Sequence, residues 1–253
     1  MEILEQELSS LIDKIENVKD FKQTLNGINS IYPFSRYEYI ISSLLSRKIL
    51  SFEEYLELRD NYINRNLFLH VFEITAPRGF GDTWAFSHLL SVEPELKRPT
   101  KKVDPTYKGE YDLYLPYATV NIKIEVKASR AVDRDKADEP LYVKALSSDS
   151  KRRFLMNFQQ LKPSCCDVFL WIAVYRDCVK YWALKNTVIK THHDFTPQHR
   201  NESTLDRSKD YEKTDIFEGQ IMITNANIST IKNYSIKSRS IKQAIIDQYE
   251  SKT

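Results

Sequence analysis

The sequence predicts an α/β fold, in which a central mixed β-sheet is flanked by helices and preceded by an N-terminal helical region. Apolar and polar residues alternate between positions 113 and 127, which indicates a pair of strands. A nearly continuous apolar run over residues 167 to 175 indicates a strand buried on both faces. With 253 residues, 42% hydrophobic and 28% charged, the chain is long enough for one sizeable core and a smaller appended region.

Two regions are expected: a helical one over residues 1 to 70, and a main α/β domain over residues 71 to 253 that ends in a C-terminal extension. The apolar stripe of the first region consists of Ile3, Leu4, Leu8, Leu11, Ile12 and Ile15. A second helical stretch is expected over residues 37 to 45, and Ser51 has the sequence context of a helix N-cap. Packing or dimerisation is the simplest role for these helices.

The main domain is expected to begin with a turn at Gly79 and Gly81, followed by a helix. Either Asp82 or Thr83 could cap this helix. His88, within it, is interpreted as a packing or surface histidine rather than as a catalytic base.

A strand pair is expected at residues 113 to 127, with a break over residues 116 to 119 where the chain turns. Successive strand side chains point to opposite faces, so the aliphatic residues of both strands share one face. They are Leu113, Leu115, Ile122, Ile124 and Val126. A slip of one residue would expose all of them, which fixes the pairing parity. The same parity places Asp112, Glu125 and Lys127 together on the other face, with opposed Cβ atoms roughly 5 Å apart.

Residues 149 to 161 are expected to form a helix, because their apolar side chains repeat at helical spacing and Pro163 ends the run. These side chains are Phe154, Leu155, Phe158 and Leu161. Gln159 and Gln160 are expected on the surface of this helix, and facing the active site is the alternative.

The rest of the chain alternates strands and helices. The buried strand at residues 167 to 175 is expected to pair with residues 179 to 184 across a short turn. One more strand is expected over residues 218 to 226, and a final helix over residues 238 to 249. The packed side of that helix would carry Ile241, Ala244, Ile245 and Tyr249.

Charge and cysteine content narrow the functional classes. The formal net charge of +2 does not by itself indicate a nucleic-acid partner, but residues 97 to 108 carry five positive side chains and one negative one. This run is suited to contact phosphates, and a solvated loop is an equal alternative. Cys165, Cys166 and Cys178 are expected to be core thiols. Without an apolar run of about 18 residues or a secretory N-terminus, a cytoplasmic protein is expected.

Asp112, Glu125 and Lys127 resemble the motif of the PD-(D/E)XK nucleases, and more closely that of the type II restriction endonucleases among them. The motif has an acidic residue that ends one strand, a variable gap, and then an acid, any residue and a lysine on the next strand. The resemblance spans roughly residues 79 to 184. Tyr111 departs from the motif, which has proline before the first acid.

The resemblance implies a restriction-endonuclease-like core and a Mg²⁺ site held by Asp112, Glu125 and the main-chain carbonyl of Val126. Lys127 would orient the attacking water or offset charge in the transition state. Asp82 matches an accessory acid that the helix before the hairpin often contributes, and helix capping explains it equally well.

For the whole protein, the resemblance implies sequence-specific hydrolysis of double-stranded DNA to 5′-phosphate and 3′-hydroxyl ends. It also implies a homodimer and a cognate DNA methyltransferase in the same system. Lys101, Lys102 and Arg130 are the candidate DNA contacts. The sequence His192-His-Asp194 matches no zinc pattern, so a DNA-contacting loop is expected there.

Four alternatives stay open. The same active site would also serve a structure-specific DNA repair or junction-resolving nuclease. An inactive nuclease fold would serve as a DNA-binding module. Independently of these two readings, direct DNA contact is the alternative role of the N-terminal helical region. Finally, Glu-x-Lys on an exposed strand face is usually a solvated ion pair without a catalytic role.

Overall fold

The computed structural model describes residues 43–45, 47–77, 79–197 and 218–251. The contacts within the chain divide it into two compact units, residues 1–70 and 71–253, and each is described by itself. The apolar stripe expected between residues 3 and 15 lies outside the described residues. Of the helix expected over residues 37 to 45, residues 43–45 are described and are helical.

The first unit contains α4 (Phe52–Asn66), which begins at the predicted cap. The main-chain N–H of Glu54 donates to the Ser51 hydroxyl at 3.1 Å, and the N–H of Ser51 donates to the Glu54 carboxylate at 2.8 Å. This reciprocal pair satisfies two N–H groups that a helix N-terminus leaves without partners. The predicted cap at Ser51 is therefore confirmed.

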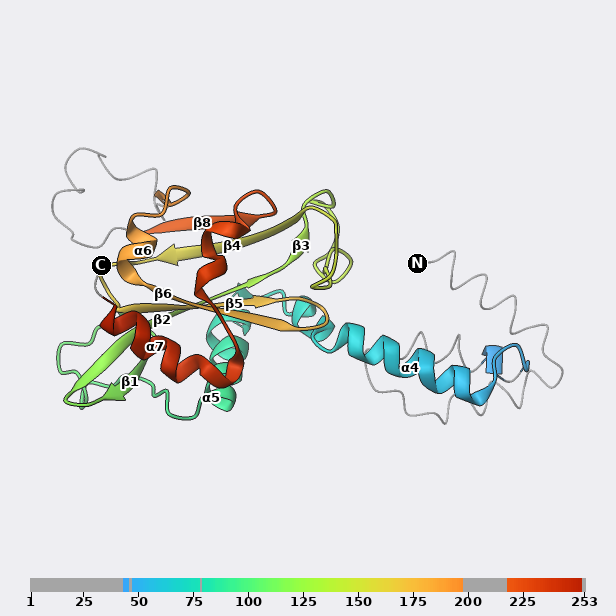
Figure 1. The fold of residues 1–253 in the computed structure, drawn as a ribbon, viewed down its shortest axis with the longest axis horizontal. Coiled ribbons are helices and arrows are strands. Elements are labelled where there is room, and N and C mark those ends of the chain that lie inside the picture. The colour runs from blue at the N-terminus through green and yellow to red at the C-terminus, as the bar shows by residue number, and fades with distance from the viewer. Residues whose placement is uncertain (1–42, 46, 78, 198–217, 252–253) are drawn as a thin grey trace. The chain divides into compact units, whose positions relative to one another are not determined.

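The second unit is built on a mixed five-stranded sheet in the order β1-β2-β5-β6-β9 (Figure 1). Its strands are β1 (Leu113–Tyr117), β2 (Val120–Arg130), β5 (Val168–Val174), β6 (Val179–Lys185) and β9 (Ser235–Ile236). The β2–β5 pair is parallel and the other three pairs are antiparallel. The strands expected at 113–127, 167–175 and 179–184 are confirmed, and so is the mixed α/β sheet.

A second, antiparallel sheet lies over one face of the first, in the order β3-β4-β8-β7. Its strands are β3 (Val132–Asp133), β4 (Phe154–Leu161), β8 (Gly219–Thr224) and β7 (Thr196–Pro197). The strand expected over residues 218 to 226 is confirmed as β8. The second sheet itself was not anticipated, because its central strand β4 has a helix-like sequence pattern.

The helix expected over residues 149 to 161 is wrong, since residues 154–161 form β4. Its pairing with β8 shifts register between Phe158 and Leu161, and Gln160 in the gap has a left-handed φ of 57°. Such a bulge adds one residue to a strand. The buried positions are therefore Met156, Phe158 and Leu161, at spacings of two and three, which imitates a helical repeat.

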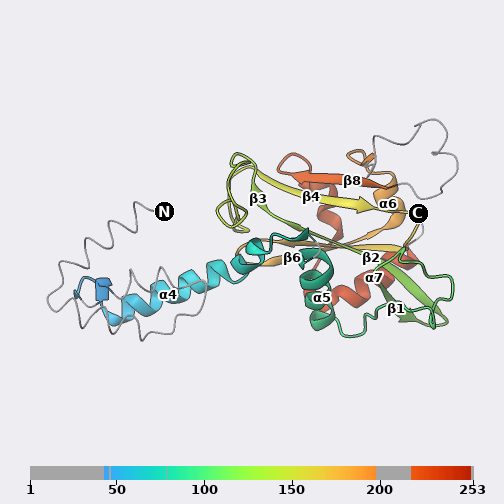
Figure 2. The ribbon, with the colours of Figure 1, turned by 180° about the vertical axis from the view of Figure 1, so that it is seen from behind.

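Helices cover the opposite face of the five-stranded sheet. A π-helical segment, η2 (Gly79–Ala85), runs directly into α5 (Phe86–Val92), and the last helix is α7 (Ile241–Glu250). Both views show α5 and α7 on the side of this sheet away from β4 and β8 (Figures 1 and 2). The final helix is as predicted, with Ile241 and Ile245 buried.

The predicted helix cap near residue 82 is wrong. Asp82 lies inside η2, and the N-cap position of α5 is occupied by Ala85, which makes no side-chain cap bond. The π-helical turn continues the backbone hydrogen bonding upstream of α5, so no side chain is needed there to satisfy the first N–H groups.

The main hydrophobic core fills the space between the two sheets. Its centre is the ring of Trp171 on β5, stacked on Phe158 of β4 with ring centroids 4.1 Å apart. Both side chains are fully buried, and each burial of this size stabilises the fold by about 1.5–3 kcal/mol. Cys166 belongs to this core, and all three cysteines are free thiols. Among the described residues, no helix has the length and apolar character needed to cross a membrane.

Candidate active site

Asp112 sits where the β1–β2 ladder ends. The ladder pairs Leu113 with Ile124, so β2 has no β1 partner beyond that point. The N–H of Asp112 donates to the Ile124 carbonyl at 3.0 Å, and its carboxylate accepts the N–H of Val126 at 2.8 Å. The carboxylate thus takes the place of a strand at the free edge of β2.

The hairpin register brings the three motif side chains together. The ladder ends at the pair Leu113 and Ile124, and Asp112 lies in the bend just before it, where its charge raises the pKa of Glu125. Lys127 follows Glu125 on the same face of β2, and its Nζ lies 2.7 Å from Oε1 of Glu125. The side chains at 112, 125 and 127 therefore lie close together.

This group is buried, unlike a surface ion pair. The side chains of Glu125 and Lys127 are only 4% and 17% exposed. Removing two charges from water costs several kcal/mol per ion, and their attraction does not reliably repay it. The pair is thus not the solvated Glu-x-Lys contact that the sequence left open. The free energy that this ion pair adds to folding therefore does not explain why it is buried.

The two carboxylates also disturb each other. The pKa of Glu125 is raised to about 7, because burial and the negative charge of Asp112 together outweigh the opposing effect of Lys127. Burial likewise raises the pKa of Asp112, against the favourable influence of Lys127 and of the Val126 N–H. One amine does not neutralise two buried acids, and a bound cation would remove the remaining repulsion.

A cavity of about 1030 Å³ opens beside these residues. Its walls are the η2 turn, the free edge of β2 and the outer part of β4. The polar side chains that line it are Asp82, Asp112, Lys127, Ser129, Arg130, Asn157, Gln159 and Gln160. A large cavity with few convergent polar groups and shifted pKa values is the usual form of an active site.

Asp82 reaches this cavity from the opposite wall. It is exposed on η2, and its negative charge contributes to raising the pKa of Asp112. The sequence therefore pointed to a residue that does lie beside the motif, although its expected alternative role as a cap is wrong.

Sequence reasoning missed the contribution of β4. Gln159 and Gln160 were placed on a helix surface, and the structure puts both in the cavity wall together with Asn157. The Oδ1 atom of Asn157 is buried and has no hydrogen-bond partner among the described residues. The positive charge of Lys162, just after β4, lowers the pKa of both Asp112 and Glu125. The sequence offered little signal here, because Phe154, Leu155 and Met156 are all apolar and the bulge at Gln160 shifts the next buried position to Leu161.

Arg130 makes contacts that stabilise the fold next to the cavity. Its Nε donates to the carbonyl of Val71 at 3.1 Å and its Nη2 to that of Ile74 at 2.5 Å, while the guanidinium lies 3.8 Å from the ring centroid of Phe80. These contacts fasten the segment before η2 to β2. Arg130 also lines the cavity, so its role as a DNA contact stays a prediction.

Lys101 and Lys102 lie on an exposed turn and are not among the residues that line the cavity. His88 stacks between Trp84 and Tyr181, and its Nε2 shares a hydrogen bond with the Tyr181 hydroxyl at 2.5 Å. This is the packing role expected of it. His199 and the rest of the expected DNA-contacting loop after residue 197 lie outside the described residues.

Comparison of the chain with family models, with curated proteins and with solved structures finds no match. The functional assignment therefore rests on Asp112, Glu125 and Lys127 and on the cavity that Asp112 and Lys127 line.

Proposed function

We propose that the chain is a Mg²⁺-dependent endonuclease that hydrolyses phosphodiester bonds of duplex DNA to 5′-phosphate and 3′-hydroxyl ends. We assign it to the type II restriction endonucleases of the PD-(D/E)XK superfamily. The observation that carries the proposal is that the partly buried Asp112 and Lys127 line a large cavity, while the buried carboxylate of Glu125 lies directly behind them and contacts Lys127.

The donor set fits Mg²⁺, a hard cation that prefers oxygen ligands. The carboxylates of Asp112 and Glu125 supply two such groups. Main-chain groups alternate between the two edges of a strand, so the carbonyl of Val126 points to the same free edge as that of Ile124, whose oxygen bonds to Asp112. When bound there, Mg²⁺ would polarise the phosphate and lower the pKa of a water ligand.

The protein's own side chains supply the remaining requirements. The ammonium of Lys127, held by Glu125, stands at the cavity edge, where it offsets negative charge that develops on the phosphate. Asp112 is held in place by the Val126 N–H and lines the cavity. Asp82, on the facing wall, is placed to hold a water molecule or a second cation.

The architecture supports the proposal in part. A helix precedes the catalytic hairpin, and two further strands extend the same sheet, as in the expected core. The second helix of that core is absent from the described segment between β2 and β5. The strands β3 and β4 occupy its place and form one wall of the cavity.

A restriction enzyme of this kind would act as a homodimer, because two-fold symmetry matches a palindromic site and allows both strands to be cut. A cognate DNA methyltransferase would protect the host's own sites. Both partners belong to the proposal and follow from the class of enzyme.

Unmethylated plasmid DNA, Mg²⁺ and the purified chain provide the test, with Asp112→Asn and Lys127→Ala as inactive variants. Asp247→Asn, on the exposed face of α7, is the matched control for the loss of one acidic charge. We expect discrete DNA fragments from the wild type and the control and none from the two inactive variants.

Other outcomes identify the alternatives. Cutting of branched DNA only would replace the proposal with a junction-resolving nuclease. Binding of DNA without cutting in Mg²⁺ or Mn²⁺ would replace it with a DNA-binding module on an inactive nuclease fold.

A further inference from the structure

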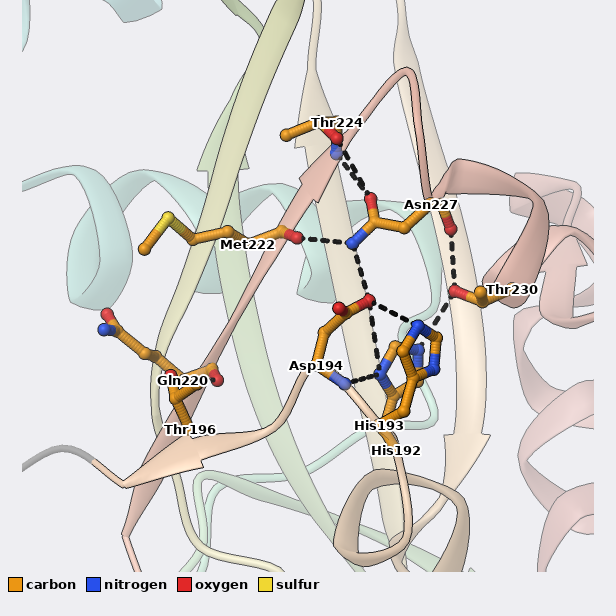
Figure 3. Close-up of polar contacts among 9 residues, drawn as sticks. All are labelled: His192, His193, Asp194, Thr196, Gln220, Met222, Thr224, Asn227 and Thr230. Atoms are coloured by element: carbon orange, nitrogen blue, oxygen red, sulfur yellow. Dashed lines mark hydrogen bonds and ion pairs between the residues drawn. The ribbon is translucent and has the colours of Figure 1, made fainter.

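A second group of metal-binding side chains lies in the short segment between α6 (Asn186–Lys190) and β7 (Figure 3). Oδ2 of Asp194 lies 3.1 Å from Nε2 of His193 and 3.9 Å from Nδ1 of His192. All three atoms lie within 4.8 Å of one another. Two imidazole nitrogens and a carboxylate oxygen therefore lie close enough together to form a candidate metal site.

The hydrogen bonds around His192 determine which of its ring nitrogens is protonated and which one carries the lone pair that a metal ion would use. The N–H of Asp194 donates to Nδ1 at 3.2 Å, so Nδ1 is unprotonated. Nε2 lies 3.0 Å from the hydroxyl of Thr230, which itself donates to the Asn227 carbonyl at 2.7 Å. The hydroxyl proton is thus already used, and Nε2 must be the N–H donor. A metal-binding histidine characteristically donates its second ring N–H to an oxygen acceptor in this way.

Hydrogen bonds also fix the orientation of the Asp194 carboxylate. Nδ2 of Asn227 donates to Oδ2 of Asp194 at 2.7 Å and to the carbonyl of Met222 at 2.8 Å. The amide oxygen of Asn227 in turn accepts the N–H of Thr224 at 2.7 Å. This network, drawn in Figure 3, ties the segment at residues 192–194 to the turn that follows β8.

We propose that His192 Nδ1, His193 Nε2 and Asp194 Oδ2 bind a transition-metal ion of the Zn²⁺ type. Two imidazoles and one carboxylate suit Zn²⁺ and Co²⁺ and discriminate against Mg²⁺, which prefers all-oxygen sites. Three protein ligands leave one position for water. The ion would lie apart from Asp112 and Glu125 and would join the 192–194 segment to the β8 turn.

Binding of a metal ion at this site would require the side chain of His193 to rotate. The rings of His192 and His193 are nearly parallel, with an interplanar angle of 13°, so one ion cannot lie in both ring planes. Zinc ligands also lie within about 4.2 Å of one another, twice the metal–ligand distance. The side chain of His193 is 68% exposed and can rotate, while that of His192 is 6% exposed and is held in place. Binding would replace the single hydrogen bond from the Asp194 N–H to Nδ1.

Equilibrium dialysis of the full chain against Zn²⁺, in excess Mg²⁺, tests the site, and Co²⁺ reports ligand geometry through its visible absorption. We expect one zinc ion per chain in the wild type and none in His193→Ala. Thr230→Val, which removes the acceptor for Nε2–H, should weaken binding by about tenfold or more. His70→Ala, an exposed histidine of the other unit, is the matched control and should bind as the wild type does.

The experiment is separable from the nuclease proposal, because Asp112→Asn should retain the zinc ion whether or not the wild type cuts DNA. Circular dichroism melting of His193→Ala checks that this exposed substitution leaves the fold intact. Absence of zinc from the wild type would overturn the inference. Zinc that remains in a folded His193→Ala would do the same.

Discussion

Individual side chains at the candidate site are held in positions that oppose stability. Glu125 and Asp112 are buried close together, and burial raises the pKa of both. A raised carboxyl pKa means that ionisation near neutral pH destabilises the folded state relative to the unfolded chain. Groups kept under such conditions are concentrated at functional sites.

Asp112→Asn should therefore abolish DNA cleavage and raise the melting temperature in the absence of metal. The amide oxygen of asparagine can still accept the Val126 N–H, whereas the repulsion from Glu125 and Asp82 is lost. Each kcal/mol gained should raise the melting temperature of a chain of this size by about 2–4 °C. Differential scanning fluorimetry with Asp247→Asn as control measures the change, and a lower melting temperature would contradict the electrostatic argument.

The Lys127→Ala variant tests whether Lys127 offsets charge in the transition state or is needed for metal binding. Lysine is not a proposed ligand, so Mg²⁺ should still raise the melting temperature of this variant, as it should in the wild type. Cleavage should fall by about 100-fold or more, as on loss of one group that stabilises transition-state charge. A Mg²⁺ titration monitored by thermal melting, together with a plasmid assay, gives both values. Loss of the Mg²⁺ effect would show that Lys127 is needed to build the site.

Among the elements, the β1–β2 hairpin sets the geometry of the site. Its two-residue turn contains Ala118 at a φ of 49°, in the left-handed region that favours glycine. The turn determines the register, which pairs Leu113 with Ile124 and so brings Asp112 to the edge of β2 beside Val126. The site thus depends on a local backbone conformation that its own sequence does not favour.

Ala118→Gly should stabilise the protein by roughly 1 kcal/mol, because glycine adopts this φ without a steric penalty. Thr119→Gly, at the neighbouring turn position, is the matched control and should not stabilise, since no left-handed φ is relieved there. Urea denaturation followed by tryptophan fluorescence gives both free energies. Equal effects of the two substitutions would remove backbone strain as the cause.

The outer part of β4 forms one wall of the cavity, and the bulge there changes which side chains face it. Gln159 is exposed and lines the cavity, so Gln159→Ala should leave the melting temperature nearly unchanged. If this wall contacts DNA, the variant should raise the KM for cleavage or alter the preferred sequence. Steady-state kinetics on short duplexes provide the measurement. Unchanged kinetics would exclude Gln159 from substrate recognition.

At the scale of the whole molecule, the two units have separable expected roles. The candidate catalytic residues and the cavity all belong to residues 71–253, while residues 1–70 form a unit of their own. A chain that begins at residue 68 should therefore fold. If the first unit provides the dimer contact, the shortened chain should sediment as a monomer and should nick plasmids rather than cut both strands. A shortened dimer that still cuts both strands would place the dimer interface elsewhere.

Much of the fold was predictable where one local pattern determined one element. The alternation that places Ile122 and Ile124 on one face of β2, the apolar run of β5 and the spacing of Ile241 and Ile245 each reflect a single periodicity. Prediction failed at β4, where the bulge at Gln160 converts a strand repeat into an apparent helical one. It also failed to place Asn157 beside Ser129, a contact between segments far apart in the chain.

By itself, the sequence determined which of its residues face together within one hairpin. Side-chain alternation and the need to bury the aliphatic residues allow a single parity for Asp112, Glu125 and Lys127. Only the tertiary structure decided that β4 would close a cavity over them, and that Asn227 and Thr230 would orient Asp194 and His192. These contacts join distant segments and depend on how the sheets pack, which no local periodicity encodes.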